Sequence, residues 1–282
     1  MKLFLECLPC ILRQVWDASK MATDDAAVQE QIMQDAIGVL GRYREYRNSP
    51  HIAREMHRVV RAHTGNADPY VQVKQRDLDM ALTLLPELER QLLQKDDRLY
   101  WALKASATGN VLDSAIYAAH DIGKFDAEFA QPFAICDDAV LRQKLQTAKT
   151  LLVIGDNTGE TVFDCLLLKQ FAHLKRTYAV RSAPVINDAT MDEALASGLG
   201  DYAEVISTGC DSPGVLLDDC GADFKRLFFA ADIVISKGQG NFETLSDCPR
   251  ELFFLLKAKC PVIAHLFQVP LNGYVFKYKK DQ

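Results

Sequence analysis

The sequence predicts an α/β fold in which a mostly parallel sheet with covering helices follows an all-α N-terminal domain. In the second half of the chain, short apolar or β-branched runs alternate with segments of helical spacing, the pattern of a parallel sheet covered by helices. In the first half, apolar residues recur at helical spacing, and no convincing strand is found before about residue 149. We therefore expect two domains, a helical one of residues 1–147 and an α/β one of residues 148–282.

The helical elements come first. Helical spacing of apolar residues runs through residues 30–46, 49–65, 76–94 and 97–120. Ser49 and Pro50 are expected as the cap and the first-turn proline of the second of these segments. Gly109 and Asn110 should break the last segment into two helices.

The strands are expected after the domain boundary. The predicted runs are residues 150–155, 177–182, 203–208, 231–236 and 260–266. In an open parallel sheet, ligands bind beyond the carboxyl ends of the strands, because the loops converge there and helix N-termini present backbone amides. The residues that follow each predicted strand therefore indicate function.

The composition is that of an ordinary globular protein and argues against two classes of partner. The 282 residues are 49% hydrophobic and 25% charged, with a formal net charge of -6 and a pI near 5.6. This acidic balance argues against a broad nucleic-acid-binding face. No stretch approaches the roughly 20 apolar residues that span a membrane. Most of the eight cysteines stand singly in apolar segments, as reduced thiols do, so we expect a cytoplasmic protein.

Oxygen donors and a cation follow the predicted strands. Asp156, Asn157 and Asp188 form a set of hard oxygen ligands of the kind that holds a divalent cation. Lys237 follows the fourth strand, and Gly238 behind it lets a backbone amide approach closely, so this loop is expected to bind a phosphoryl group. Each residue taken singly has an ordinary explanation as a helix cap, a turn residue or a solvated charge. Their place after successive strands of one sheet favours a shared site.

The other strand-end loops narrow the choice of ligand. Asp211 lies in a glycine-bracketed loop and is expected to orient a substrate hydroxyl. The loop "GDNTGE" at 155–160 lacks the G-x-G-x-x-G pattern that a pyrophosphate requires, and "GQGN" at 238–241 follows a late strand. A nicotinamide or flavin enzyme is therefore disfavoured.

Read together, these motifs resemble the damage-control phosphatases, also called domain-of-unknown-function family eighty-nine or the acidic-residue methyltransferase-like family. The resemblance covers essentially the whole chain and is greatest with the prokaryotic branch. The segments that carry it are "ECLPCILRQ" (6–14), "GNVLD" (109–113), "GDNTGE" (155–160), "PVINDAT" (184–190), "STGCDSPG" (207–214) and "SKGQGNFETL" (236–245).

The resemblance implies a helical N-terminal part packed on a Rossmann-like α/β part that carries a metal-dependent phosphatase site. It implies Asp156, Asn157 and Asp188 as ligands of magnesium, manganese, cobalt or nickel, with Lys237 on the phosphate. Asp156, Asp188 and Lys237 are then the expected catalytic residues. The residues expected around the substrate and its phosphate, besides Lys237, are Asn110, Glu160, Asp211 and Gly238. The implied substrates are sugar phosphates or damaged phosphometabolites.

Cys7 and Cys10 form a C-x-x-C pair, a feature of the prokaryotic branch. Residues three apart on a helix share a face, so the two thiols can bind one metal ion. A structural zinc site usually needs four ligands, and no other two are identified. Two buried thiols on an apolar helix face explain the pair equally well.

Three functions remain open on the sequence. The first is a metal-dependent phosphatase, in which the attacking group is either a metal-bound water or a carboxylate such as Asp156. The second is a carboxylate methyltransferase that uses S-adenosyl-methionine, although the first loop offers only two glycines for such a cofactor. The third is a non-enzymatic metal-binding protein, a hypothesis that the Cys7 and Cys10 pair supports. The sequence carries no signal of oligomeric state.

Overall fold

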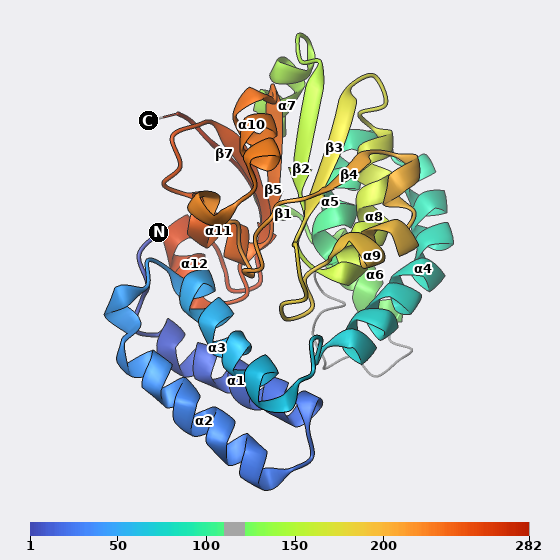
Figure 1. The fold of residues 1–282 in the computed structure, drawn as a ribbon. Coiled ribbons are helices and arrows are strands. Elements are labelled where there is room, and N and C mark those ends of the chain that lie inside the picture. The colour runs from blue at the N-terminus through green and yellow to red at the C-terminus, as the bar shows by residue number, and fades with distance from the viewer. Residues whose placement is uncertain (110–121, 282) are drawn as a thin grey trace.

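A computed structural model of the chain describes residues 1–109 and 122–281 (Figure 1). Within these ranges the strands are β1 (Phe133–Cys136), β2 (Thr150–Ile154), β3 (Lys175–Val180), β4 (Glu204–Ser207), β5 (Ile233–Lys237), β6 (Leu252–Lys257) and β7 (Tyr274–Lys279). They form one seven-stranded sheet in the order β1-β7-β6-β5-β2-β3-β4. All neighbouring strands are parallel except β6 and β7. The predicted α/β class with a mostly parallel sheet is confirmed.

Four of the five predicted strands correspond to β2, β3, β4 and β5. The fifth prediction, residues 260–266, is wrong, because this segment forms helix α12 (Pro261–Phe267). Cys260 is its N-cap and Pro261 opens its first turn, where a fixed φ suits a helix and a missing N–H costs nothing. Proline at this place was the signal that the apolar run begins a helix.

Three strands, β1, β6 and β7, were not predicted from the sequence. β6 is buried along its whole length, and a short continuous apolar run cannot be told from a buried helix by periodicity alone. β1 has four residues and lies at an edge of the sheet beside β7. The expectation that no strand precedes residue 149 is therefore wrong, since β1 begins at Phe133.

The first three helices form a group with a core of their own. They are α1 (Cys7–Ala22), α2 (Ala26–Gly41) and α3 (Ser49–Thr64). Their shared buried core is made of Ile11, Val15, Ala18, Ile32, Ala36, Ile52, Ala53, Met56, Val60 and Tyr70. Helix α3 is capped by Asn48 rather than by Ser49, because the Asn48 side chain accepts from the backbone N–H of His51. Its C-cap is Gly65, whose φ of 64° is the left-handed value that glycine tolerates.

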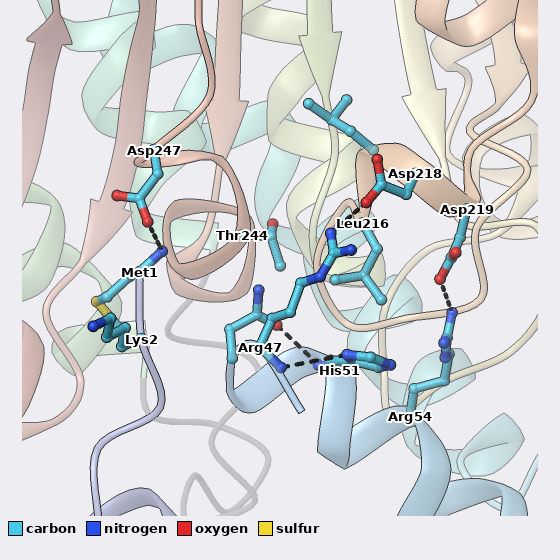
Figure 2. Close-up of a pocket in the computed structure, with 12 residues that line it drawn as sticks. Met1, Lys2, Arg47, His51, Arg54, Leu216, Asp218, Asp219, Thr244 and Asp247 are labelled. Atoms are coloured by element: carbon cyan, nitrogen blue, oxygen red, sulfur yellow. Dashed lines mark hydrogen bonds and ion pairs between the residues drawn. The ribbon is translucent and has the colours of Figure 1, made fainter. Parts of the chain in front are cut away.

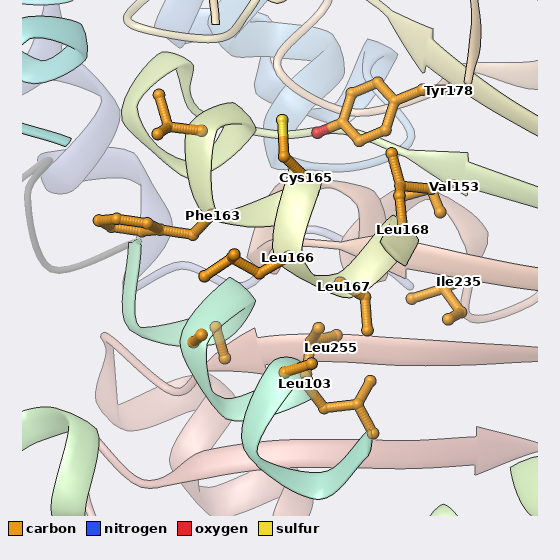
Figure 3. Close-up of a cluster of buried hydrophobic side chains, with 14 of the residues drawn as sticks. Leu103, Val153, Phe163, Cys165, Leu166, Leu167, Leu168, Tyr178, Ile235 and Leu255 are labelled. Atoms are coloured by element: carbon orange, nitrogen blue, oxygen red, sulfur yellow. The ribbon is translucent and has the colours of Figure 1, made fainter. Parts of the chain in front are cut away.

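A second group of helices covers one face of the sheet (Figure 1). It includes α4 (Val71–Leu93), α5 (Arg98–Thr108), α6 (Ile122–Ala130), α7 (Asp138–Leu145), α8 (Thr158–Lys169) and α9 (Met191–Ala196). Figure 3 shows Leu166, Leu167 and Leu168 of α8 among side chains of α5 and the strands. Thus α4 and α5 share a core with the sheet, whereas α1–α3 have a separate one. The domain division at residue 147 remains a prediction.

The opposite face of the sheet is covered by α10 (Ala222–Ala230), α11 (Gln239–Leu245) and α12. Successive side chains of β2 point to opposite faces of the sheet. Leu151 and Val153 belong to the core on the first face, and Leu152 and Ile154 to the core on the second. This alternation is what a sheet covered on both faces requires.

The chain runs from β2 outward to β3 and β4, then returns to place β5 on the other side of β2. The order of strands therefore reverses between β2 and β5, and such a switch point is where open α/β sheets bind ligands. Within the described residues, no helix is long and apolar enough to cross a membrane.

Candidate functional site

The loops after β2 and β3 are joined by backbone hydrogen bonds at the switch point. Ala189 donates its N–H to the carbonyl of Asp156 at 2.8 Å, and Thr158 donates to the carbonyl of Asn187 at 2.9 Å. Asn157 and Asp188 pair in an isolated antiparallel bridge. The structure therefore brings together Asp156, Asn157 and Asp188, although the last two are 31 positions apart in the chain.

These three side chains are almost fully buried. Asp156, Asn157 and Asp188 are 7%, 6% and 3% exposed. Gly238 explains how the Asp156 carboxylate fits, because a Cβ at position 238 would lie 2.0 Å from Asp156 Oδ2. Gly238 also has a φ of +79°, and its N–H donates to the carbonyl of Leu255. The absence of a side chain at Gly238 therefore makes room for the Asp156 carboxylate. Its backbone N–H, which was expected to face a phosphoryl group, is hydrogen-bonded to β6.

Arg181 is a member of the site to which sequence reasoning gave no role. Its Nε donates to Asp188 Oδ2 at 2.6 Å, and its Nη2 lies 3.6 Å from Asp156 Oδ1. Burial alone would lower the pKa of this guanidinium, but the carboxylates of Asp188 and Asp156 outweigh burial and raise it. Arg181 therefore stays charged and separates two carboxylates that would otherwise repel each other. Its position directly after β3, where site residues are expected, could have identified it as a member of the site.

Asn241 holds Arg181 and two strand ends in place. Its Oδ1 accepts from Arg181 Nη1 and from the N–H of Val215, both at 3.0 Å. Its Nδ2 donates to the carbonyls of Gly155 and Lys237. Four hydrogen bonds use the full capacity of this buried amide. The residue fixes the ends of β2 and β5 and the loop after β4 relative to one another.

Lys237 is fully buried, and its ammonium group is surrounded by acceptors. Nζ lies 2.7 Å from Glu160 Oε2, 2.5 Å from Asp164 Oδ1 and 3.2 Å from the carbonyl of Ser106. Burial would lower the pKa of Lys237, but Asp164 and Glu160 outweigh it and raise the pKa. An ammonium has three N–H donors, and three acceptors are present. Because all three donors have acceptors within the protein, this geometry does not favour the direct contact with phosphate that was expected of Lys237.

Glu160 and Asp164 complete this buried lysine cluster, the name used below for Lys237, Glu160 and Asp164. Glu160 Oε1 accepts from Asn157 Nδ2 at 3.1 Å, so the lysine cluster reaches the candidate metal ligands. Burial raises the pKa of Glu160 to about 7, against the opposing effect of Lys237. Asp164 also accepts from Ser106 Oγ and from the hydroxyl of Tyr178. Sequence reasoning missed Asp164, which lies inside α8 without any motif of its own.

The structure does not place Asp211 with the other expected site residues. Its carboxylate accepts from Arg58 at 3.0 and 3.1 Å and lies 3.5 Å from Arg61 Nη2, both on α3. Arg54 of the same helix pairs with Asp219 at 2.6 Å. We call these five residues the α3 arginine cluster. It binds helix α3 to the loop after β4, and a role of Asp211 in orienting substrate remains a prediction.

The remaining expected residues lie elsewhere. Asn110 lies outside the described residues. Cys7 begins α1 and is half-buried, and Cys10 is exposed. Burial raises the pKa of both thiols, and nearby Cys260 and Glu243 raise both further. In residues 1–109 and 122–281, no three or more His, Cys, Asp or Glu side chains are grouped as a metal site.

A pocket of about 350 Å³ lies apart from the expected site residues (Figure 2). The residues that line it are Met1, Lys2, Arg47, Asn48, His51, Arg54, Leu216, Leu217, Asp218, Asp219, Thr244 and Asp247. Three of its cations are paired: Arg47 contacts Asp218, Arg54 contacts Asp219, and the N-terminal amine contacts Asp247. None of the expected site residues lines this pocket.

The donors at the switch point fit a divalent cation by their chemistry. Two carboxylates and one amide supply oxygen ligands from two adjacent loops. Arg181 contacts Asp188 Oδ2 and Asp156 Oδ1, and a carboxylate that accepts from an arginine can also ligate a cation. Nη2 of Arg181 is buried and has no hydrogen-bond partner among the described residues. A buried donor of this kind indicates that an acceptor belongs in the site.

Comparison with known proteins places these observations in a family. A sequence model described as the damage-control phosphatase ARMT1-like domain matches residues 3–275. A protein named damage-control phosphatase from Pyrococcus horikoshii is 33% identical, over 98% of this chain and 97% of its own. Another of that name from Archaeoglobus fulgidus is 29% identical, over 98% and 99%. A crystal structure of a DUF89 family protein from Pyrococcus horikoshii superposes with a TM-score of 0.92 at 32% identity, covering 99% of this chain and 100% of that one.

Proposed function

The chain belongs to the damage-control phosphatase ARMT1-like family, and on that premise we propose that it is a divalent-metal-dependent phosphatase acting on a small phosphorylated metabolite. The observation that supports the metal is the convergence of Asp156, Asn157 and Asp188 at the switch point of the sheet. Magnesium, manganese, cobalt and nickel are the candidate ions, and sugar phosphates or damaged phosphometabolites are the candidate substrates.

Asp156, Asn157 and Asp188 would hold the cation. When bound, such a cation neutralises charge on phosphoryl oxygens and lowers the pKa of a coordinated water. Arg181 keeps the two carboxylates apart and in place. Its Nη2 lies 3.6 Å from Asp156 Oδ1 and has no partner at hydrogen-bond distance among the described residues, so it would donate to a phosphoryl oxygen. Lys237, whose ammonium faces three protein acceptors, is assigned a supporting role in place of direct contact with phosphate.

We further propose a cytoplasmic location. All eight cysteines are unpaired, which suits a reducing compartment.

The proposal is tested by assaying phosphate release from a panel of phosphorylated metabolites with magnesium, manganese, cobalt or nickel. Turnover of at least one compound that EDTA abolishes is expected. Absence of release from every compound with every ion would leave a non-enzymatic metal-binding protein, and saturable calorimetric binding of S-adenosyl-methionine would favour a methyltransferase.

Asp188→Asn tests the ligand set directly. Losing one of two anionic ligands should weaken manganese binding on the order of 100-fold and reduce turnover at least as much, while the amide still accepts from Arg181. Asp192→Asn, on helix α9 and four residues further along, is the matched control and should be nearly silent. Unchanged turnover in Asp188→Asn would remove Asp188 from the site.

A further inference from the structure

A buried chain of hydrogen bonds lies behind Asn157. Asn157 Nδ2 donates to Glu160 Oε1 at 3.1 Å, and the other oxygen of Glu160 lies 2.7 Å from Lys237 Nζ. Asp164 and the carbonyl of Ser106 are the further acceptors of Lys237. The chain thus runs from a candidate metal ligand, through a carboxylate, to a cation that is itself fixed on its far side.

We infer that Glu160 and Lys237 are positioning residues that hold the side-chain amide of Asn157 with its oxygen, rather than its nitrogen, available to the cation. This inference rests on the proposed function, because it assumes Asn157 to be a metal ligand. A primary amide has one end that ligates metals and one that does not, and the two ends have almost the same shape. Glu160 Oε1 accepts its hydrogen bond from Nδ2, so this contact determines which end of the Asn157 amide faces Glu160 and which faces the cation.

The location of Glu160 makes this contact a fixed one. Glu160 lies in the first turn of α8, three residues after Asn157, a spacing that puts the two side chains on one side of the helix start. Gly109, at the end of α5, packs so closely that a Cβ there would lie 2.9 Å from Glu160 Cα. Asn157, Glu160 and Lys237 are all buried. Water therefore cannot easily replace a lost partner.

Lys237 secures the second oxygen of Glu160. With that oxygen held by the ammonium group, the carboxylate keeps the plane in which Oε1 meets Asn157. This explains why a lysine at a strand end of the candidate site faces away from solvent and toward two carboxylates. The residue acts on the metal through Glu160 and Asn157, so its role is positioning and not catalytic contact.

Glu160→Gln tests the inference, because a carboxylate that accepts from two donors is replaced by an amide with one acceptor. The glutamine oxygen should turn to Lys237, and its NH₂ group then faces Asn157 and favours a flipped asparagine. Calorimetric titration with Mn²⁺ alone, without substrate, should show at least about tenfold weaker binding, as found when partners of metal ligands are removed.

The reciprocal double variant, Asn157→Asp with Glu160→Gln, supplies a rescue. It keeps the total charge of the pair and reverses the hydrogen bond, since the glutamine NH₂ can donate to the new aspartate while the glutamine oxygen still accepts from Lys237. Mn²⁺ affinity should return to within about threefold of wild type. Asn157→Asp alone completes the double-mutant cycle and separates the effect of the added carboxylate.

Tyr178→Phe is the matched control one contact further away. It removes the hydroxyl that donates to Asp164 Oδ2 at 2.6 Å but leaves Glu160 and Asn157 untouched. Mn²⁺ affinity should stay within about twofold of wild type, even as the protein becomes less stable to urea.

The outcomes separate the inference from the proposed function. If wild type does not bind Mn²⁺, the proposed metal site itself fails. If wild type binds and Glu160→Gln binds equally well, the positioning role is overturned. Should Glu160→Gln not fold, the double variant decides, because a reversed but intact hydrogen bond must allow folding and Mn²⁺ binding, and failure of either contradicts the inference.

Discussion

The buried lysine cluster and the α3 arginine cluster contain the same kinds of charged group in opposite surroundings. Lys237 is 0% exposed, and the side chains of Glu160 and Asp164 are each 1% exposed. In the α3 arginine cluster, Arg58 is 45% and Asp211 is 21% exposed. The first cluster lies at the end of strand β5 and in helix α8, and the second joins helix α3 to the loop after β4.

This difference shows how burial determines what an ion pair does. In a buried cluster, removing one partner leaves charges that neither water nor another group can satisfy, so every member depends on the others. In a partly exposed cluster, water replaces a lost partner and each pair contributes little. The buried lysine cluster therefore fixes geometry at the candidate site, while the α3 arginine cluster sets how the first three helices lie on the sheet.

Lys237→Met should give the largest effect on stability. It removes the only charged counterpart of Glu160 and Asp164 among the described residues, and breaking a buried pair in this way costs about 3–5 kcal/mol of unfolding free energy. Urea denaturation measures the change. Lys277→Met, which breaks a half-exposed pair with Asp137, is the control and should cost less than about 1 kcal/mol. Equal losses in the two variants would contradict the comparison.

A second prediction concerns pH and His57 on α3. Burial, followed by the charge of Arg61, lowers the pKa of His57 from 6.5 to about 4. The unfolded chain therefore binds a proton at higher pH than the folded one, and stability is lost as pH falls from about 6.5 to about 4. Relative to His57→Gln, wild type should lose about 3 kcal/mol of unfolding free energy between pH 7 and pH 4. Parallel urea stability curves over this range would show that His57 is not the titrating group.

The sequence was sufficient for the fold class because the central strands keep one period. Four short apolar runs, which form β2, β3, β4 and β5, alternate with helical segments. This alternation supports the assignment of each run as a strand. Residues 260–266 and 252–257 were harder, because a six- or seven-residue apolar run has the same composition in a buried strand and in a short buried helix. What decided them was Pro261 in one case and pairing with β5 and β7 in the other.

The site could be predicted only where its residues share a location relative to the strands. Asp156 and Asp188 follow successive strands, so topology alone brings their loops together. The contact of Arg181 with Asn241 spans 60 positions, and that of Lys237 with Asp164 spans 73. Such pairs depend on how two helices and a loop pack, which no local pattern records. Likewise, nothing in the sequence indicated that Asp211 pairs with arginines, since these lie on a helix about 150 positions earlier.

The smallest effect is expected in the α3 arginine cluster, and its dependence on salt sharpens the comparison most. Arg58→Met removes three hydrogen bonds to Asp211, but Arg61 Nη2 remains 3.5 Å from that carboxylate and Arg54 Nη1 3.8 Å away. The unfolding free energy should therefore fall by only about 0.5 kcal/mol. Charges that reach solvent are screened over a Debye length of about 10 Å at 0.1 M salt and about 3 Å at 1 M. Urea denaturation at 0.05 M and 1 M sodium chloride should then show the Arg58→Met difference shrinking toward zero.

The same pair of salt concentrations should leave the Lys237→Met difference almost unchanged, because ions cannot enter the space between Nζ and its two carboxylates. A difference for Arg58→Met that exceeds about 2 kcal/mol or ignores salt would mean that this cluster behaves as a buried one. The ion pairs would then contribute strongly to holding helix α3 against the sheet. Helices α1–α3, which have a core of their own, would in that case be fixed relative to the candidate site.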